Sequence, residues 1–339
     1  MARPGIWITA EEVAMLPVEG PAWDQVARWA LGPWERPNLA DQDSNHDLEV
    51  LAGALYAVRM HDEAVRRRVI DGLAGVAGTE REGRVLALAR NIVGYVVAAE
   101  LVGYRDAEFL SWLDAVRFAQ LDGRSLVSTH ERRPNNWGTH AGAARVAIAR
   151  FLDDDEDLQR AALVFKGYLG DRRSYAGFVF DADLSWHPDR LAPVPINPAG
   201  ATIDGHSVDG VITDDARRVG GFRWPFPAEE SGANYMWEAM QGIVLQAALL
   251  HRAGYDAWQW EDRAVLRAAV WLVHEASMPP DGDDQWQAWL INDAYGADLP
   301  LTSPARSGKS IGFTDWTHGA APSVEEVVQT GVSEERRQR

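Results

Sequence analysis

The sequence contains no cysteine, only two lysines and no long apolar run. The absence of cysteine excludes disulfide bonds, thiol catalysis and cysteine-based zinc sites. No stretch of about 18 or more uncharged apolar residues occurs, so we expect no membrane span and no membrane partner. The first residues also lack the apolar segment and cleavage site of a secretory signal. The compartment stays open: cytoplasmic for the chain as given, secreted or periplasmic if a leader has been removed.

Acidic residues outnumber basic ones, 50 to 33, which leaves a net charge of −17. This charge argues against a nucleic-acid partner, because phosphate binding requires a basic face. Any site for an acidic ligand must therefore concentrate positive charge locally within an acidic body. Lys166 and Lys309 are the only lysines, so we expect cationic sites to use arginine, whose planar guanidinium matches a carboxylate.

The 339 residues read mainly as consecutive amphipathic helices. Apolar residues recur at helical spacing over stretches of roughly 12–20 residues, with short Gly, Asp or Pro breaks between them. Because short connections force antiparallel neighbours, this pattern predicts helical hairpins. We expect helices at 21–32, 46–60, 62–78, 83–103, 106–121, 135–152, 156–170, 234–256 and 261–277, with 281–296 packed on the last of them.

Residues 171–233 differ from the rest. They are rich in Pro, Gly, Asp and aromatic residues and show no helical period, and long loops of this kind in compact domains are often functional. No segment alternates strongly as a strand does. We therefore predict an all-α fold, an (α/α)n toroid or incomplete barrel of antiparallel helical hairpins, as a single catalytic domain over 1–320. The charged residues 321–339 are expected to form a flexible tail.

The stretch RRPNNWGTH, at 132–140, crowds polar side chains onto the start of an apolar helix. Pro134 suits a helix entry, and Asn135 is a good N-cap. Asn136 and His140 lie on one helix face, which continues with apolar residues and so points inward. The positive helix end favours a bound anion and a neutral imidazole. Two interpretations remain open: ordinary capping above a buried histidine, or a site for proton abstraction next to a carboxylate.

A second polar cluster spans 204–218 and is followed by the start of another helix. It offers His206, Arg217, Arg218 and, at the helix start, Tyr235. An arginine there would hold a carboxylate, and a tyrosine would exchange a proton. The Asp-Gly pairs of this cluster also suit simple turns, and Tyr235 could face either a cleft or the core.

Several of these stretches resemble the alginate lyase superfamily of polysaccharide lyases. RRPNNWGTHAGAARVAIARFLDD is similar to that superfamily's Asn-Asn-His helix start. DGHSVDGVITDDARR, followed by NYMWEAMQGIVLQAALLHRAGYD, is similar to a later segment in which an arginine precedes a tyrosine near the next helix. RPGIWITAEEVAMLP is similar to the start of these domains. The resemblance spans most of residues 5–300 in order, although each motif is short.

The resemblance implies an α/α toroid that cleaves uronic-acid polymers by β-elimination, a carbon–oxygen lyase acting on polysaccharides without a cofactor. Its partner would be an acidic polysaccharide or oligosaccharide. Asn136 would neutralise the C6 carboxylate of the sugar. Tyr235 would protonate the leaving O4 and could also be the base. Arg217 or Arg218 would assist the carboxylate or hold the tyrosine as phenolate.

The sequence departs from the family pattern at Trp137, which stands where the family has its histidine. His140 or His206 would replace that histidine, unless Tyr235 makes both proton transfers. Because the placement of the base depends on which face of the uronate carries the C5 proton, the exact polymer stays open. Glucuronan or another glucuronate polymer is at least as good a candidate as alginate.

Further side chains are expected to contact the substrate in the same cleft. Tryptophans beside polar side chains are typical of sugar-binding clefts, although core packing explains any single one better. Several of these candidates lie in loops that could equally be surface loops outside the cleft. No histidines show the i, i+4 pairing of a helical zinc motif, so we expect no catalytic metal. The substrate-binding candidates are Asn135, Trp137, Arg133, Arg217, Asn45, His46, Trp186, Trp237, Lys309 and His318.

Three other functions remain open. An inverting glycoside hydrolase needs two carboxylates across a cleft, for which Asp204, Asp214, Asp215 and Glu238 are candidates. The acidic run DDDED at 153–157 could hold magnesium in a terpene-cyclase-like protein, although a turn between two helices explains the run better. The third is a non-catalytic toroid that binds acidic sugars or a protein partner.

Overall fold

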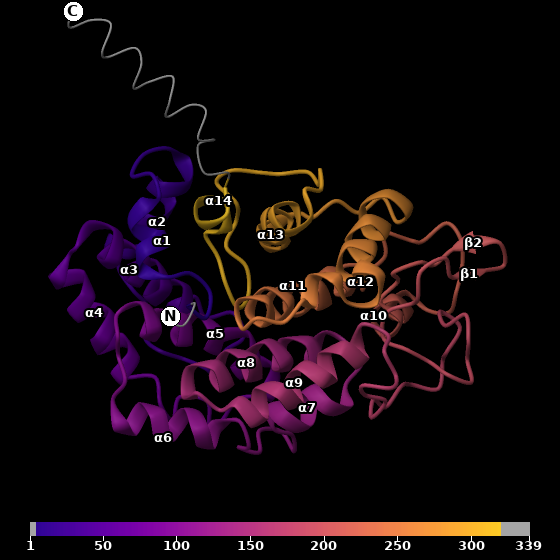
Figure 1. Ribbon diagram of the computed structural model, residues 1–339, viewed down its shortest axis with the longest axis horizontal. Helices are drawn as coiled ribbons and strands as arrows, with labels where there is room; N and C mark the ends of the chain where they lie inside the picture. Colours follow the sequence, from indigo (N-terminus) through magenta and orange to yellow (C-terminus); the bar gives the residue numbers. More distant parts are fainter. Residues whose placement is uncertain (1–4, 320–339) are drawn as a thin grey trace, which may run out of the picture.

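The computed structural model describes residues 5–319, so the tail expected at 321–339 lies outside the described residues. This part of the chain is mainly helical, as predicted, with fourteen α-helices and two short strands (Figure 1). The first seven helices are α1 (Ala10–Met15), α2 (Pro21–Leu31), α3 (His46–Met60), α4 (Glu63–Ala74), α5 (Val85–Leu101), α6 (Ala107–Val116) and α7 (Leu126–Arg132). The others are α8 (Asn136–Leu152), α9 (Asp155–Tyr168), α10 (Thr213–Ala216), α11 (Tyr235–Arg252), α12 (Trp260–Val270), α13 (Trp286–Tyr295) and α14 (Thr314–Thr317).

Four helices, α3, α5, α8 and α11, form a row through the centre of the molecule. Helix α5 packs against both α3 and α8, and α8 packs in turn against α11. All but one of the 17 residues of α5 are buried, and so are 15 of the 17 residues of α8. A helix that is covered on every side has to be apolar nearly all round, which is why α5 and α8 lack a polar face.

Helices α4, α9 and α12 cover this row. They contact α3, α8 and α11, respectively. In α4 the buried residues are Val65, Val69 and Leu73, which recur every four positions on one face. The amphipathic pattern predicted from the sequence is therefore found in α4, whereas α5 is apolar almost throughout.

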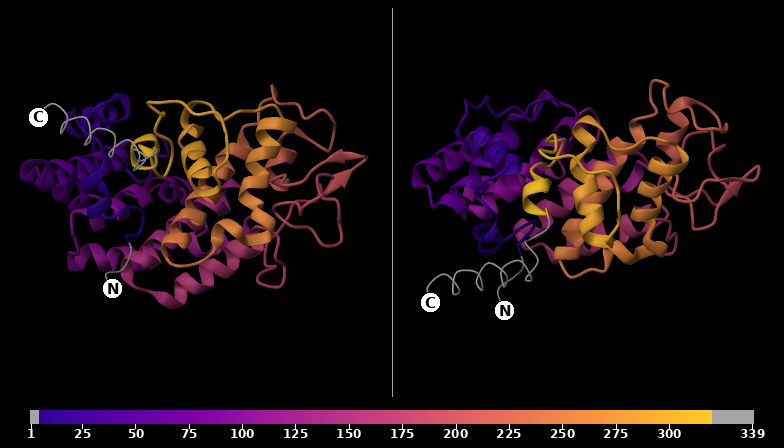
Figure 2. Two further views of the ribbon diagram at one scale, coloured as in Figure 1. Left: turned by 45° about the horizontal axis from the view of Figure 1, so that its top comes forward. Right: turned by 90° about the horizontal axis from the view of Figure 1, so that it is seen from above.

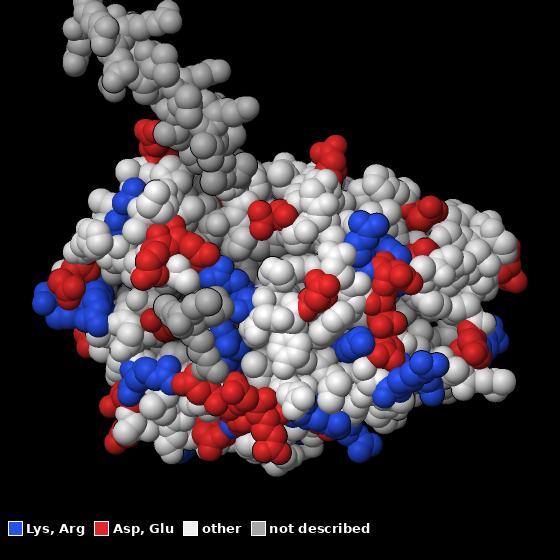
Figure 3. Space-filling model, viewed as in Figure 1, with Lys and Arg blue, Asp and Glu red and all other residues white. Residues whose placement is uncertain are grey.

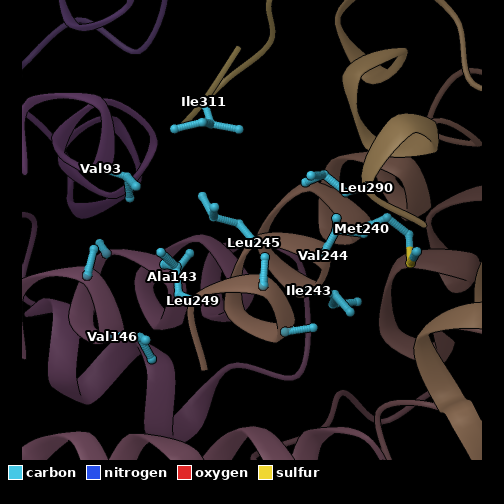
Figure 4. Close-up of a cluster of buried hydrophobic side chains, with 14 of the residues drawn as sticks. Val93, Ala143, Val146, Met240, Ile243, Val244, Leu245, Leu249, Leu290 and Ile311 are labelled. Atoms are coloured by element: carbon cyan, nitrogen blue, oxygen red, sulfur yellow. The ribbon is translucent and has the colours of Figure 1, made fainter. Parts of the chain in front are cut away.

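Part of the core lies between α5, α8, α11 and α13 (Figure 4). Val93, Val146 and Leu245, one from each of the first three helices, are fully buried there. Helices α8 and α11 come very close, because a Cβ on Gly242 would collide with the backbone at Thr139. Only glycine permits this approach. It brings the N-terminal turns of α8 and α11 together.

Local sequence signals place most helix ends correctly. Helix α3 spans the predicted residues, and α8 begins directly after its N-cap Asn135. The sequence period does not reveal α7, since seven residues are too few for it to show. A capping box formed by Ser125 and Ser128 begins that helix. At the other end, α12 continues into a π-helical turn at Trp271–Glu275, within the segment predicted as one helix.

Residues 171–233 contain little regular structure, as predicted. Strands β1 (Thr202–Ile203) and β2 (His206–Ser207) pair as a small antiparallel hairpin. Figures 1 and 2 show this segment at the opposite end of the molecule from α1–α4. The segment packs through its aromatic residues, since Trp186 meets Phe226 and the Trp271 ring edge-on.

The acidic run at 153–157 joins α8 to α9. Asp154 caps α9 by accepting a hydrogen bond from the Asp157 backbone N–H at 3.0 Å. The carboxylates of Asp154 and Asp157 also pair with Arg117, at 2.8 and 2.9 Å. These contacts account for the run as a turn between two helices.

Charges of both signs are mixed on the surface. On the face drawn in Figure 3, acidic and basic side chains lie interspersed, with no extended patch of either sign. Within residues 5–319, every helix falls short of the length and hydropathy that a membrane crossing requires.

Candidate functional site

A polar cavity of about 450 Å³ lies where the N-terminal ends of α5, α8 and α11 meet. Arg84 is the N-cap of α5. Asn136 and Trp137 belong to the first turn of α8, and Tyr235 and Glu238 to the first turn of α11. The full lining is Gln42, Arg84, Leu86, Arg90, Asn136, Trp137, Arg218, Gly232, Asn234, Tyr235 and Glu238. Residues from the two polar stretches of the sequence therefore share one cavity.

This cavity is positively charged although the protein as a whole is acidic. Arg84, Arg90 and Arg218 line it. Among the described lining residues, Glu238 is the only carboxylate, and it forms an ion pair with Arg90. The N-termini of α5 and α11 each add the equivalent of roughly half a positive charge. Guanidinium groups and these two helix ends together favour an anionic ligand.

Buried carboxylates of α10 hold the first turn of α8. Asp215 accepts a hydrogen bond from the Asn136 backbone N–H at 3.1 Å, and Asp214 accepts one from the Asn135 side chain at 2.9 Å. The Trp137 backbone N–H donates to Asn135 Oδ1 at 3.3 Å. Burial raises the pKa of Asp215 well above its usual range, and the charge of Asp214 raises it further. The backbone N–H groups of Asn136 and Trp137 are therefore occupied by the protein itself, so that side chains would have to bind a ligand here.

The side chain of Asn136 is buried but not satisfied. The residue is 1% exposed, it lines the cavity, and its Oδ1 has no hydrogen-bond partner among the described residues. A buried polar atom without a partner costs about 1–3 kcal/mol, and most buried polar atoms are paired. Because Oδ1 is an acceptor, a donor such as a sugar hydroxyl could partner it, whereas a carboxylate could bind only the N–H groups of the same amide.

Tyr235 and Arg218 meet on another wall of the cavity. The guanidinium carbon of Arg218 lies 4.7 Å from the centre of the Tyr235 ring, and its Nε is buried without a hydrogen-bond partner. Tyr235 is 39% exposed. Arg217 instead pairs with Asp214 at 2.8 Å and with Asp181 at 3.2 Å. Of the two arginines left open by the sequence, Arg218 reaches the cavity and Arg217 does not line it.

Arginines surround the indole of Trp137. The guanidinium carbons of Arg84, Arg124 and Arg133 each lie 5.8 Å from the centre of its ring. Arg84 also donates a hydrogen bond to the Gln42 side chain at 2.7 Å. We call Arg84, Arg124 and Arg133 the arginine rim.

His140 faces inward, as its helical position predicts, but it does not line the cavity. It is completely buried, and its Nδ1 lies 3.2 Å from the Ser310 hydroxyl. Burial lowers the pKa of His140 well below its usual range, and the charges of Arg90 and Lys309 lower it further. The imidazole is therefore neutral, as expected, although burial is the main cause rather than the helix end.

The other three predicted histidines lie apart from the cavity lining. His46 Nδ1 is 2.7 Å from the Tyr95 hydroxyl in the core. His206 stacks on Trp224 in the β1–β2 hairpin, with ring centres 5.0 Å apart. His318 packs against an N-terminal tryptophan, beside a different cavity. Within residues 5–319, no three His, Asp or Glu side chains are grouped as a metal site would require.

The remaining predicted residues divide between the core and a second cavity. Trp186 and Trp237 are buried, and each donates its indole N–H to a backbone carbonyl, so neither presents a face to a sugar. Asn45 and Lys309 line a cavity of about 280 Å³. Arg90 and Asn91, which are consecutive in α5, line one of these two cavities each.

Arg90 is a site residue that helical spacing alone does not reveal. It is a single cation inside the apolar stretch VLALARNIVGYVV, and it is buried. Burial lowers its pKa, while nearby carboxylates, Asp283 first, raise it. A lone charge in a helix that is otherwise apolar is the signal that could have identified it, because buried charges need a partner or a function.

Comparison of the chain with protein-family models finds no match, and a search of curated protein sequences finds no significantly similar protein. The function therefore has to be inferred from the residues that line the cavity.

Proposed function

We propose that the protein is a polysaccharide lyase that cleaves a uronic-acid-containing polysaccharide by β-elimination and leaves an unsaturated uronate end. The observation that carries this proposal is the lining of the cavity. Asn136, Arg218 and Tyr235 come from distant parts of the chain and share one site with an excess of positive charge. An amide, guanidinium groups and a phenol are the groups that this elimination needs.

The reaction removes a proton from C5 of the uronate, next to its C6 carboxylate. The electron pair left behind forms the C4–C5 double bond, the C4–O bond breaks, and the leaving O4 takes up a proton. Negative charge builds on the carboxylate as the C5 proton leaves. In the proposed mechanism the amide of Asn136 and the guanidinium of Arg218 stabilise that charge.

Tyr235 is proposed to make both proton transfers. It is the phenol in the cavity lining, and no histidine is among the described lining residues. The step needs Tyr235 as a phenolate, which takes the C5 proton and becomes the neutral hydroxyl. The guanidinium of Arg218, 4.7 Å from the ring centre, is the positive charge proposed to favour that phenolate. The same hydroxyl then returns the proton to O4. This assignment removes the need for a histidine at Trp137.

The helix arrangement supports the proposal that the chain is a diverged member of the alginate lyase superfamily with an incomplete α/α toroid. In such a toroid, inner helices pack side by side, and an outer helix covers each one. In this proposal α3, α5, α8 and α11 would be inner helices, and α4, α9 and α12, which contact α3, α8 and α11, would be three of the outer ones. Helix N-termini of three of the inner helices meet at the proposed site.

An inverting glycoside hydrolase fits the cavity less well. That reaction needs two carboxylates across the scissile bond, whereas Glu238 is the only carboxylate in the described lining and is paired with Arg90. Asp214 and Asp215 are buried beneath the first turn of α8. Asp204 lies in the turn of the β1–β2 hairpin.

The test is a panel of alginate, glucuronan, hyaluronan and pectate, followed by the near-ultraviolet absorbance of an unsaturated uronate. We expect product from at least one polymer, and Tyr235→Phe should lower kcat about 10²–10⁴-fold. Tyr104→Phe is the matched control, because Tyr104 lies outside the cavity lining and should keep full activity. New reducing ends without the absorbance would indicate a hydrolase, and binding without any cleavage would indicate a binding protein.

A further inference from the structure

We infer that the arginine rim around Trp137 is a second anion subsite, which binds the carboxylate of the sugar next to the one that is cleaved. This inference rests on the proposed function, because the cavity is taken to hold the reacting uronate. It identifies the substrate class as a polymer in which neighbouring sugars both carry a carboxylate.

The rim arginines differ from the buried arginines Arg117 and Arg145, whose charges are neutralised by carboxylates. Arg117 pairs with three aspartates, and Arg145 pairs with Glu131 and Asp157. Within residues 5–319, none of the rim arginines forms an ion pair with a carboxylate.

The rim also brings like charges together. Since each guanidinium carbon is 5.8 Å from the centre of the Trp137 ring, no two of them are more than twice that distance apart. Arg133 is half-buried, and its Nε has no hydrogen-bond partner. Burial lowers the pKa of Arg133, and the charge of Arg124 lowers it further. A bound anion would relieve this repulsion.

The rim is continuous with the cavity but extends beyond it. Trp137 and Arg84 line the cavity, whereas Arg124 and Arg133 do not. A polysaccharide whose reacting uronate occupies the cavity therefore places its next sugar beside the Trp137 indole. Aromatic rings bind the apolar face of a sugar, and guanidinium groups bind a carboxylate through two hydrogen bonds. The rim supplies both at one position.

The expected substrates follow from this geometry. In glucuronan, alginate and pectate every sugar is a uronate, so that one carboxylate enters the cavity and the next meets the rim. In hyaluronan a neutral amino sugar alternates with each uronate, and the sugar beside the reacting one has no carboxylate for the rim.

Calorimetric titration of a glucuronate tetrasaccharide and a hyaluronan tetrasaccharide tests the subsite, with Tyr235→Phe as the background so that the sugars are not consumed. Arg124→Gln combined with Arg133→Gln should weaken binding of the glucuronate oligosaccharide on the order of 10- to 100-fold. Binding of the hyaluronan oligosaccharide should stay within about threefold. The single variants Arg133→Gln and Arg132→Gln form the matched pair, because each removes one positive charge. Arg133→Gln should weaken glucuronate binding, whereas Arg132→Gln, at the adjacent exposed position, should leave both affinities unchanged. Far-ultraviolet circular dichroism and a urea midpoint establish that each variant is folded.

Unchanged glucuronate binding in the double variant would overturn the subsite. So would a loss of glucuronate affinity in Arg132→Gln as large as that in Arg133→Gln, because it would indicate general electrostatic attraction. The two proposals fail in different ways. If the protein binds oligouronates through the rim but cleaves none, the subsite stands and the lyase does not. If it cleaves a polyuronate while the double variant keeps the wild-type KM and affinity, the lyase stands and the subsite does not.

Discussion

Asn135 and Asn136 are neighbours of the same type, yet the structure predicts opposite effects when each is replaced by leucine. Leucine keeps the branching of asparagine at Cγ and removes its polar atoms. At position 136 the replacement deletes a buried oxygen that has no partner, while the backbone N–H of that residue can still donate to Asp215. Removing the unsatisfied oxygen should raise the free energy of unfolding by about 1–3 kcal/mol.

At position 135 the same replacement removes two satisfied contacts. The Asn135 side chain caps α8 by accepting the Trp137 N–H, and it donates to the buried carboxylate of Asp214. Loss of an N-cap costs about 0.5–2 kcal/mol, and an unpartnered buried acceptor costs about 1–3 kcal/mol. Asn135→Leu should therefore lower the free energy of unfolding by about 2–4 kcal/mol.

Urea denaturation followed by circular dichroism measures both changes, and the lyase assay on the most responsive polyuronate measures function. Asn136→Leu should move the urea midpoint upward and lower kcat about 10²–10³-fold, as expected when a group that stabilises transition-state charge is lost. Asn135→Leu should move the midpoint downward. If Asn136→Leu destabilises the protein as much as Asn135→Leu does, the unsatisfied oxygen does not lower the free energy of unfolding. Asn136 would then not be a residue held in place for a ligand.

Two further predictions concern the framework of the site. Gly242→Ala should lower the free energy of unfolding by about 1–3 kcal/mol, because a Cβ there collides with the α8 backbone. Gly75→Ala, where the new atom meets only ordinary contacts, is the control, and an equal urea midpoint for the two variants would contradict the prediction. His140 has a pKa well below its usual range in the folded chain, so below about pH 6.5 the unfolded state takes up a proton that the folded state does not. Its contribution to stability is present above that pH and is lost as the pH falls, by up to about 1.4 kcal/mol per unit. His140→Gln should therefore reduce the fall in the free energy of unfolding between about pH 7 and pH 5. Urea denaturation at each pH measures this change. If the free energy of unfolding of the variant falls with pH as steeply as that of the wild type, the folded chain protonates this histidine.

Local chemistry is enough to place the helices and the polar side chains at their ends. Helical spacing, N-caps and breaks depend on residues only a few positions apart, and so the bounds of α3 and α8 could be predicted closely. The same local reasoning places Asn136 and Tyr235 at helix starts. Short helices such as α7 escape it, because two turns carry too few apolar residues to establish a period.

The sequence by itself determined the helical class, the long irregular segment and the crowding of polar groups at two helix starts, since each of these depends on neighbouring residues. Tertiary packing alone decided that the N-termini of α5, α8 and α11 meet at one cavity. It also decided that His140 and Trp237 belong to the core, because an inward helix face looks the same in a sequence whether it meets a cavity or another helix. Arg124 joins Trp137 only through the fold, and charge repulsion between residues distant in the chain exists only once the chain is packed.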